Sequence, residues 1–302
     1  MRNFLTHFKS YFCWYLLIFL AIVSLLILSV ILHEDRHGLL RFEVLDVGQG
    51  DSLFIESPTG VQVLVDGGPN KFLMKEIGKV IPWYDRHIDM LVVTNPDKDH
   101  YEGFIPLMKK YSVDVVLEPG TANTNLVYEL LEKEISNRKI PKVLARRGQI
   151  VDLGGGAYLE ILFPDRDVSG LSSNDGSIVM KLVYGETSVI LQGDSTERIE
   201  HYLVGLDGNN LKSTILKAGH HGSRTSNSLE YVEKVSPEWT VISSGSQNSY
   251  GHPHKETLDT MEKLKIFTYD TCNNGRLTFE SDGKEFILKN KYPKIAEVGC
   301  RN

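Results

Sequence analysis

The sequence predicts an α/β fold in which two mixed sheets carry helices on their outer faces. Strand-like and helix-like segments alternate from about residue 39 to residue 292, and no fixed repeat or low-complexity linker interrupts them. One long apolar run without charge stands apart near the N-terminus. We therefore expect a membrane anchor at 1–38, one α/β domain at 39–292 and a short tail at 293–302.

Strands are predicted where short apolar, β-branched runs lie between turn residues. They fall at 39–47, 52–57, 61–66, 88–94, 113–119, 142–147, 157–164, 177–185, 187–194, 213–219, 240–245, 266–270, 275–281 and 285–290. Helices are expected at 72–81, 102–111, 125–136, 195–203, 227–235 and 255–264.

The apolar run at residues 11–32 is 22 residues long, enough to cross a hydrocarbon core of about 30 Å as a helix. A secretory signal has an apolar region of only about 7–15 residues and a small-residue cleavage site, which is missing here. We therefore favour an uncleaved anchor over a cleaved signal or a buried core helix.

The charges around this run predict its orientation. Arg2 and Lys9 precede it, whereas Arg36 is the one basic residue among those that directly follow it. Because basic residues favour the cytoplasmic side, the N-terminus is expected in the cytoplasm. The chain would then be a single-pass protein of the cell membrane with its domain on the extracytoplasmic side.

Composition limits the classes of function. The chain has 302 residues and a formal net charge of −6, which argues against general electrostatic binding of nucleic acid but allows a local basic groove. The cysteines are Cys13, Cys272 and Cys300, and without a C-x-x-C pair a thiolate zinc site is not expected. Cys272 and Cys300 either pair in an oxidising compartment or stay unpaired, and the sequence leaves both open.

The first chemically informative segment is the loop Thr94-Asn-Pro-Asp-Lys-Asp-His100, which follows a buried strand. Asp97, Asp99 and His100 each offer an oxygen or a nitrogen to a metal, and a strand end is a rigid place from which to aim them. A D-x-D-H sequence alone is more often a turn with a helix cap. The loop is therefore a weak signal by itself.

Three further loops add polar side chains of the same kind. Asp194 ends an apolar strand, where it either contacts metal or caps the following helix. His220 and His221 lie between glycines directly after a strand, and His252 and His254 lie in a turn-rich loop. Together with His100, these loops hold half of the ten histidines, which favours one shared site.

The ordered motifs LDVGQGDSLFIESPTGVQVLVDGG, VTNPDKDH, LQGD, LKAGHHGS and NSYGHPH carry a family resemblance. They resemble the metallo-β-lactamase-fold domain of ComEC competence proteins and related stand-alone hydrolases, over about residues 42–279. The resemblance implies an αββα sandwich with a metal site at one edge, where strand ends meet. The motifs are specific for the fold and less specific for the substrate.

The resemblance also implies roles for particular residues. Asp99, His100 and His220 are expected as ligands of one metal, Asp194 as a bridging ligand and Asp97 as a ligand of a second metal. The choice of His220 over His221 is a preference that the sequence leaves open.

Other residues are expected around those ligands. Asp66 would support a metal ligand from behind, and His252 and His254 would lie at the substrate end. Lys217 and Arg224 would contact phosphates. Arg146 or Arg147 could also contact phosphates, although a solvated face is the more common explanation for these two.

The sequence departs from the family pattern at one position. The family loop begins H-x-D-x-D-H, but here the first position is Asn95, and residues 101–200 contain no histidine for the usual third ligand. One of the two metal positions is therefore expected to be weak or empty. The oxygen-rich set favours Mn²⁺ or Mg²⁺, and Zn²⁺ also fits, as one or two ions.

These features predict a metal-dependent hydrolase, best read as a phosphodiesterase or nuclease at the outer face of the membrane and linked to DNA uptake. Asp99 would orient or deprotonate water, and His252 or His254 would protonate the leaving oxygen. One membrane span cannot form a channel, so DNA uptake would require a channel partner.

Hydrolysis of another ester, such as a lactone or cyclic nucleotide, is one alternative. A non-catalytic binding domain with a degenerate metal site, which Asn95 favours, is another. The oligomeric state stays open.

Overall fold

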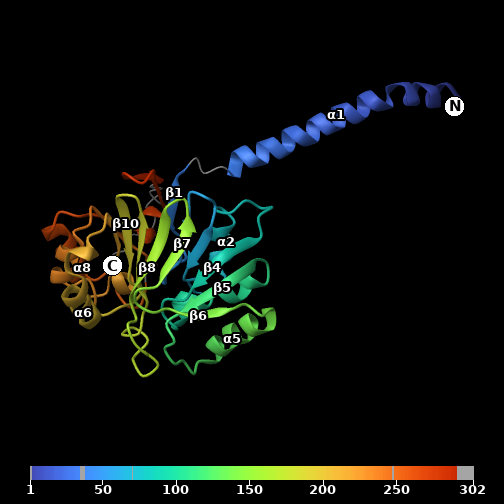
Figure 1. Cartoon of the computed structure of the whole chain (residues 1–302). Coiled ribbons are helices and arrows are strands. Elements are labelled where there is room, and N and C mark those ends of the chain that lie inside the picture. The colour runs from blue at the N-terminus through green and yellow to red at the C-terminus, as the bar shows by residue number, and fades with distance from the viewer. Residues whose placement is uncertain (1, 35–37, 70, 247, 291–302) are drawn as a thin grey trace.

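The computed structural model describes residues 2–34, 38–69, 71–246 and 248–290. Two sheets lie face to face between two outer layers of helices, and helix α1 (Arg2–Glu34) extends away from this sandwich (Figure 1). The predicted αββα fold is therefore confirmed.

The first sheet has the strand order β15-β14-β1-β2-β3-β4-β5-β6. Its strands are β1 (Leu40–Val44), β2 (Leu53–Glu56), β3 (Gln62–Val65), β4 (His87–Val92), β5 (Ser112–Glu118), β6 (Lys142–Leu144), β14 (Leu277–Ser281) and β15 (Phe286–Asn290). Strands β3 to β6 are parallel, and β1 runs in the same direction because β1 and β3 are both antiparallel to β2. The carboxyl ends of β1, β3 and β4 consequently lie at one edge.

The second sheet has the order β13-β12-β11-β10-β9-β8-β7. Its strands are β7 (Ile150–Gly154), β8 (Ala157–Phe163), β9 (Val179–Tyr184), β10 (Thr187–Leu191), β11 (Ile215–Lys217), β12 (Trp239–Ile242) and β13 (Phe267–Asp270). Strands β10 to β13 are parallel, so their carboxyl ends also share an edge.

Short helices complete the layers. They are α2 (Phe72–Ile77), α3 (Lys98–Tyr101), α4 (Phe104–Met108), α5 (Leu126–Arg138), α6 (Glu197–Asp207), α7 (Leu229–Val235), α8 (Lys255–Lys263) and α9 (Thr271–Asn274), with 3₁₀ turns at Gly208–Leu211 and Gly219–Gly222. Helices α2, α4 and α5 pack on the first sheet, and α6, α7 and α8 pack on the second.

The core has three layers because the central strands are buried on both faces. In β3, Val63 and Val65 face the second sheet, whereas Leu64 between them packs under the helices of the first sheet. This alternation follows from the two-residue period of a strand. It explains why the strand sequences read as continuous apolar runs rather than as alternating ones.

Several elements differ from the sequence prediction, among them the short helix α9, which was not expected. The helix expected at 102–111 is two short helices, α3 and α4, and α3 begins earlier, at Lys98. Strand β7 was not expected, because at the edge of its sheet it buries only Leu153 fully and lacks an apolar run.

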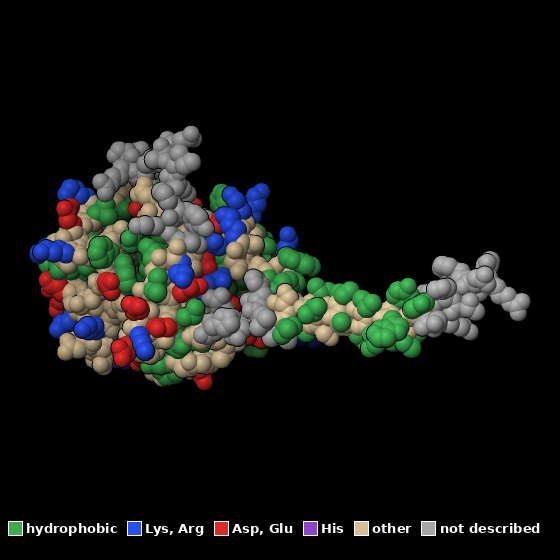
Figure 2. All heavy atoms as spheres, turned by 90° about the horizontal axis from the view of Figure 1, so that it is seen from above, with side chains coloured by type: hydrophobic (Ala, Val, Ile, Leu, Met, Phe, Trp, Pro, Cys, Tyr) green, Lys and Arg blue, Asp and Glu red, His purple; other side chains and the backbone are tan. Residues whose placement is uncertain are grey.

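The two ends of the chain bear on the predicted membrane span and on the pairing of cysteines. Within α1, Tyr11–Ser29 has a mean hydropathy of 2.6 and is long and apolar enough to cross a membrane, and its hydrophobic side chains project clear of the folded domain (Figure 2). At the other end, Cys272 is buried and disulfide-bonded, whereas Cys300 and the predicted tail at 293–302 lie outside the described residues.

Candidate metal centre

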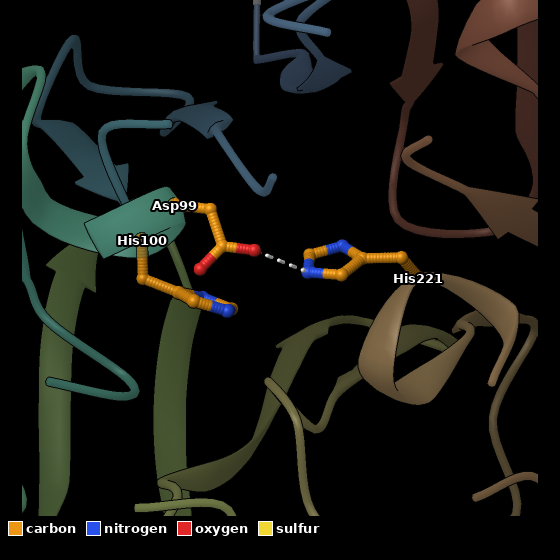
Figure 3. A group of neighbouring side chains, drawn as sticks. All are labelled: Asp99, His100 and His221. Carbon is orange, nitrogen blue, oxygen red and sulfur yellow. Dashed lines mark ion pairs between the residues drawn. The ribbon is translucent and has the colours of Figure 1, made fainter. Parts of the chain in front are cut away.

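The polar loops of the sequence converge at the carboxyl edge of the two sheets. Asp66 follows β3, His100 follows β4, Asp194 follows β10 and His221 follows β11. Asp99 and His100 project from the start of α3 toward His221, which comes from the opposite sheet (Figure 3). The site therefore forms only when the two sheets pack together.

His100 is fully buried and held from one side by Asp66. Its Nδ1 lies 2.8 Å from Asp66 Oδ2, while Thr94 donates to both oxygens of Asp66 through its backbone nitrogen at 2.8 Å and its hydroxyl at 2.6 Å. The other ring nitrogen, Nε2, lies 3.1 Å from Asp194 Oδ2. The imidazole is thus oriented with Nε2 toward the centre.

His221 is held in the same way by a residue that the sequence analysis did not identify. Its Nδ1 lies 3.1 Å from Asp51 Oδ1. Its Nε2 lies 3.2 Å from Asp99 Oδ2 and 3.6 Å from Asp194 Oδ1. Both centre-facing histidines therefore have one carboxylate behind Nδ1 and a second carboxylate facing Nε2.

Asp51 is fixed by Lys217, which is buried rather than exposed to a substrate. The Lys217 ammonium donates to Asp51 at 2.8 Å and to the Ala218 carbonyl at 2.8 Å. Burial disfavours ionisation of Asp51, but Lys217 and His221 outweigh it and lower the pKa of this carboxyl to about 2. The available sequence signal was a carboxylate in the Gly-Gln-Gly-Asp turn just after β1.

The buried carboxylates of the centre favour positively charged groups beside them. Burial disfavours the charged form of His221, but Asp194 and Asp51 outweigh it and raise the pKa of His221 to about 10. The pKa of His100 is raised well above its usual value, again against burial, by Asp194 and Asp66. The pKa of Asp194 is lowered despite burial, because His100 and His221 face it.

The residues present fit a divalent cation. His100 Nε2, His221 Nε2 and Asp194 Oδ1 are buried without a hydrogen-bond partner among the described residues, which is rare for buried polar atoms. Ligand atoms of Asp99, His100 and His221 lie within 4.8 Å of one another, as do those of Asp51, Asp194 and His221. Imidazole nitrogen with carboxylate oxygen is a donor set that suits Zn²⁺ and Mn²⁺.

His220 approaches the same centre from nearer the surface. Its side chain is 25% exposed, its Nε2 lies 3.7 Å from Asp194 Oδ2, and its Nδ1 lies 3.2 Å from the Thr225 hydroxyl. His220 and His221 both have positive φ, 49° and 54°. This left-handed turn places consecutive imidazoles around Asp194.

Asn95 and Asp97 point to a different partner, the loop before β9. The Asn95 amide donates to Asn174 Oδ1 at 2.9 Å, and its carbonyl oxygen accepts from the Asp97 backbone at 2.9 Å. The Asp97 carboxylate accepts from the Ser173 hydroxyl at 2.9 Å. Neither side chain belongs to the groups of ligand atoms described above.

Aromatic and imidazole rings border the centre on the side of the 248–254 loop. The His252 ring centroid lies 5.4 Å from that of His220 and 4.8 Å from that of His254. Tyr250, which the sequence analysis did not single out, stacks on His252 at 5.7 Å and is 65% exposed. His252 thus borders the centre through His220, and His254 adjoins His252.

The predicted phosphate-binding arginines differ in position. Arg224 adjoins this loop, because its backbone nitrogen donates to His254 Nδ1 at 3.1 Å, and its guanidinium is largely exposed. Arg146 instead donates to the Pro119 carbonyl, and Arg147 pairs with Asp207. The contacts of Arg146 and Arg147 are thus structural.

The sequence is similar to curated competence and recombination proteins, although no protein-family model matches it. ComE operon protein 3 of Bacillus subtilis (strain 168) is 26% identical over 254 residues, which cover 78% of this chain and 32% of that protein. Recombination protein 2 of Haemophilus influenzae is 27% identical over 252 residues, covering 81% and 29%. The chain thus spans about a third of the length of these relatives.

The fold is also similar to solved structures. The metallo-beta-lactamase fold protein YhfI from Bacillus subtilis superposes with a TM-score of 0.54 at 12% identity, over 80% of this chain and all of that chain. Identity this low shows the fold alone. Taken together, these comparisons show that the chain has a metallo-β-lactamase fold and a sequence similar to that of competence and recombination proteins.

Proposed function

We propose that this chain is a metal-dependent hydrolase whose substrate is a phosphodiester of nucleic acid. The observation that carries the proposal is the set of buried, unpartnered atoms of His100, His221 and Asp194 facing Asp99. Each such buried atom costs free energy that a bound cation would recover, which supports a metal site here.

We assign one cation to Asp99, His100, His221 and Asp194. His221 replaces His220 in this set because its Nε2 is buried and lies 3.2 Å from Asp99, whereas His220 is partly exposed. Asp97 and the Asn95 amide bond elsewhere, so any second position beside His220 would be weaker. The ion is proposed to be Mn²⁺ or Zn²⁺.

A divalent cation in this site would polarise the phosphoryl group and lower the pKa of a water. The chain's own residues would supply positioning and proton transfer. Asp99 is the ligand with part of its side chain exposed, so it can orient an incoming water and accept its proton. His254 Nδ1 accepts from the Arg224 backbone, so its Nε2–H can donate a hydrogen bond to a leaving oxygen, which would take its proton from water.

The substrate class is proposed from the rim and the relatives. The exposed Arg224 guanidinium lies 3.8 Å from Glu256 and would exchange this solvent-exposed ion pair for a phosphate. The exposed face of Tyr250 suits an unpaired base. Relatives named for competence and recombination support a link to DNA uptake. The domain is proposed to act at the outer face of the membrane beside a channel supplied by another protein.

The test compares the purified full chain in detergent with Asp194→Asn, a variant of nearly the same shape. We expect the unsubstituted chain to bind metal and to cleave bis-p-nitrophenyl phosphate and DNA in the presence of Mn²⁺. The variant should lose both metal binding and cleavage. If the chain binds metal but cleaves only a lactone or a cyclic nucleotide, the proposed substrate class is wrong and that compound class takes its place. Neither metal nor cleavage would overturn the proposal in favour of a binding domain.

A further inference from the structure

The edge of the sandwich opposite the metal centre lies beside the start of the folded domain. Strands β1 and β4 run in the same direction and both begin at this edge. The connection from α2 to β4 is tied to it: Arg41 donates to the Val80 carbonyl at 2.9 Å, and Gln62 donates to Asp85 at 2.7 Å. The connection at 78–86 is therefore adjacent to the first residues of β1.

This connection presents an aromatic pair to solvent. Trp83 is 81% exposed and Tyr84 is 39% exposed, and their rings meet edge to face with centroids 5.8 Å apart. The pair has a rigid base, because Val80 and Ile81 just before it are buried in the core. The exposure of Trp83 thus does not come from a loose loop, and it leaves a large apolar surface in water.

Basic residues flank the pair in the sequence. Lys75 on α2, Lys79 after it and Arg86 before β4 are all exposed, and Lys79 also pairs with Glu76 at 2.5 Å. Arg86 also donates to the Tyr111 hydroxyl at 2.9 Å, which holds its guanidinium beside the connection. Exposed aromatic rings with flanking Lys and Arg are the composition that favours the interface of an anionic bilayer.

The chain length places this surface near the membrane. The candidate span ends at Ser29, α1 ends at Glu34 and β1 begins at Leu40. Five residues separate α1 from β1, and the six Cα steps across them reach at most about 20 Å. With the last turn of α1 after Ser29, the start of β1, and with it the connection at 78–86, therefore lies within about 30 Å of the bilayer surface if Tyr11–Ser29 spans it.

We propose that Trp83 and Tyr84 insert into the lipid interface and that Lys75, Lys79 and Arg86 contact anionic headgroups. The inference rests on the proposed membrane anchor and is independent of the hydrolase proposal. This second attachment orients the sandwich, because the six residues of β4 carry the chain about 20 Å from this edge to the metal edge. The metal centre then faces away from the bilayer, where a long polymer can reach it.

The test uses the full chain in anionic nanodiscs that contain lipids brominated at a chosen depth. The three tryptophans report separate regions: Trp14 lies in the apolar run, Trp83 on the proposed surface and Trp239 against the core. In Trp14→Phe we expect quenching by bromine near the headgroups and a blue shift relative to detergent. Both should be lost in Trp14→Phe/Trp83→Phe, in which Trp239 alone remains.

The unsubstituted chain provides the control for the anchor. Quenching of Trp14 by bromine in the acyl chains shows that the helix is inserted, because Trp14 lies just inside one end of the candidate span. If the helix is inserted but Trp83 is not quenched, the inference is overturned, and a protein partner becomes the better occupant of this surface. Absence of Trp14 quenching would instead remove the anchor on which the inference rests. Neutral lipids should weaken the Trp83 signal if the basic rim contributes.

Discussion

The two halves of the loop that follows β4 have opposite surroundings. Asn95 and Asp97 in the first half bond to the loop before β9, through Asn174 and Ser173. Asp99 and His100 in the second half face unpartnered atoms across the centre. One half of a single motif is thus built into the protein's own hydrogen bonds, and the other retains ligand capacity for a cation.

Backbone geometry accounts for this difference. Asp97 is extended, with φ −87° and ψ 150°, and α3 begins at the next residue. The carbonyls of Asp99 and His100 then accept from the backbones of Asp51 and Gly67, which ties the second half to the first sheet. The comparison teaches that a change of backbone direction at Asp97 separates structural residues from candidate ligands.

The largest effect is expected at His221. His221→Ala should lower the affinity for Mn²⁺ or Zn²⁺ by more than about 100-fold, because it removes a buried ligand rather than one of its supports. His220→Ala, its neighbour in the chain, should have a clearly smaller effect. Isothermal titration calorimetry on both variants measures this difference. Equal losses would mean that the two histidines share the ion.

Metal removal should destabilise the protein. At a free metal concentration 100 times the Kd, binding contributes about 2.7 kcal/mol to the free energy of unfolding. We expect chelation to lower the Tm of the unsubstituted chain and of Asp97→Ala by similar amounts, but to leave His221→Ala unchanged. A Tm that is insensitive to chelator in the unsubstituted chain would contradict the assigned cation site.

The support behind His100 should matter next. Asp66→Ala removes the acceptor at His100 Nδ1 and is expected to cost about 10- to 100-fold in metal affinity. Asp66→Asn keeps an acceptor oxygen and should cost less. Competition with a chelating dye measures both affinities. If the alanine and asparagine variants lose affinity equally, the charge of Asp66 matters rather than its hydrogen bond.

Asp97→Ala sharpens the comparison from the other half of the loop. Because its carboxylate accepts from Ser173 and lies outside the ligand groups, we expect less than about a tenfold loss of metal affinity, below that of an outer support. Asp99→Ala is the matched control and should lose far more. Similar losses in the two variants would show that both halves of the loop bind metal.

The smallest effect is expected at Asp165, in the segment that leads to Ser173 and Asn174. A hydrogen bond from Arg166 outweighs desolvation and lowers the pKa of Asp165 to about 2. A lowered pKa stabilises the fold above the unfolded-state value near 4, and this contribution is lost as pH falls through 2. Asp165→Asn should cost at most about 1 kcal/mol at pH 7, because the pair is solvent-screened, and less as the pH falls. Urea unfolding at pH 7 and pH 3 checks the trend, and a cost that grows toward pH 3 would contradict it.

The sequence by itself determined the fold class and the neighbourhood of the site. Buried strands such as β3 and β4 are apolar on both faces, so their patterns were readable, and the polar loops at their carboxyl ends had to share an edge. Strand β7 escaped prediction because an edge strand buries little. The role of Asp51 escaped it because a Gly-Gln-Gly-Asp turn resembles an ordinary connection.

Only the tertiary structure separated residues of identical type. His220 and His221 are adjacent and chemically the same, yet His221 alone contacts Asp51, 170 residues earlier in the chain. Lys217 lies inside rather than at a substrate because that same carboxylate receives its charge. The physical reason is that burial and partners across the two sheets decide which nitrogen stays unpaired. Contacts between residues so far apart in the chain cannot be predicted from the local sequence.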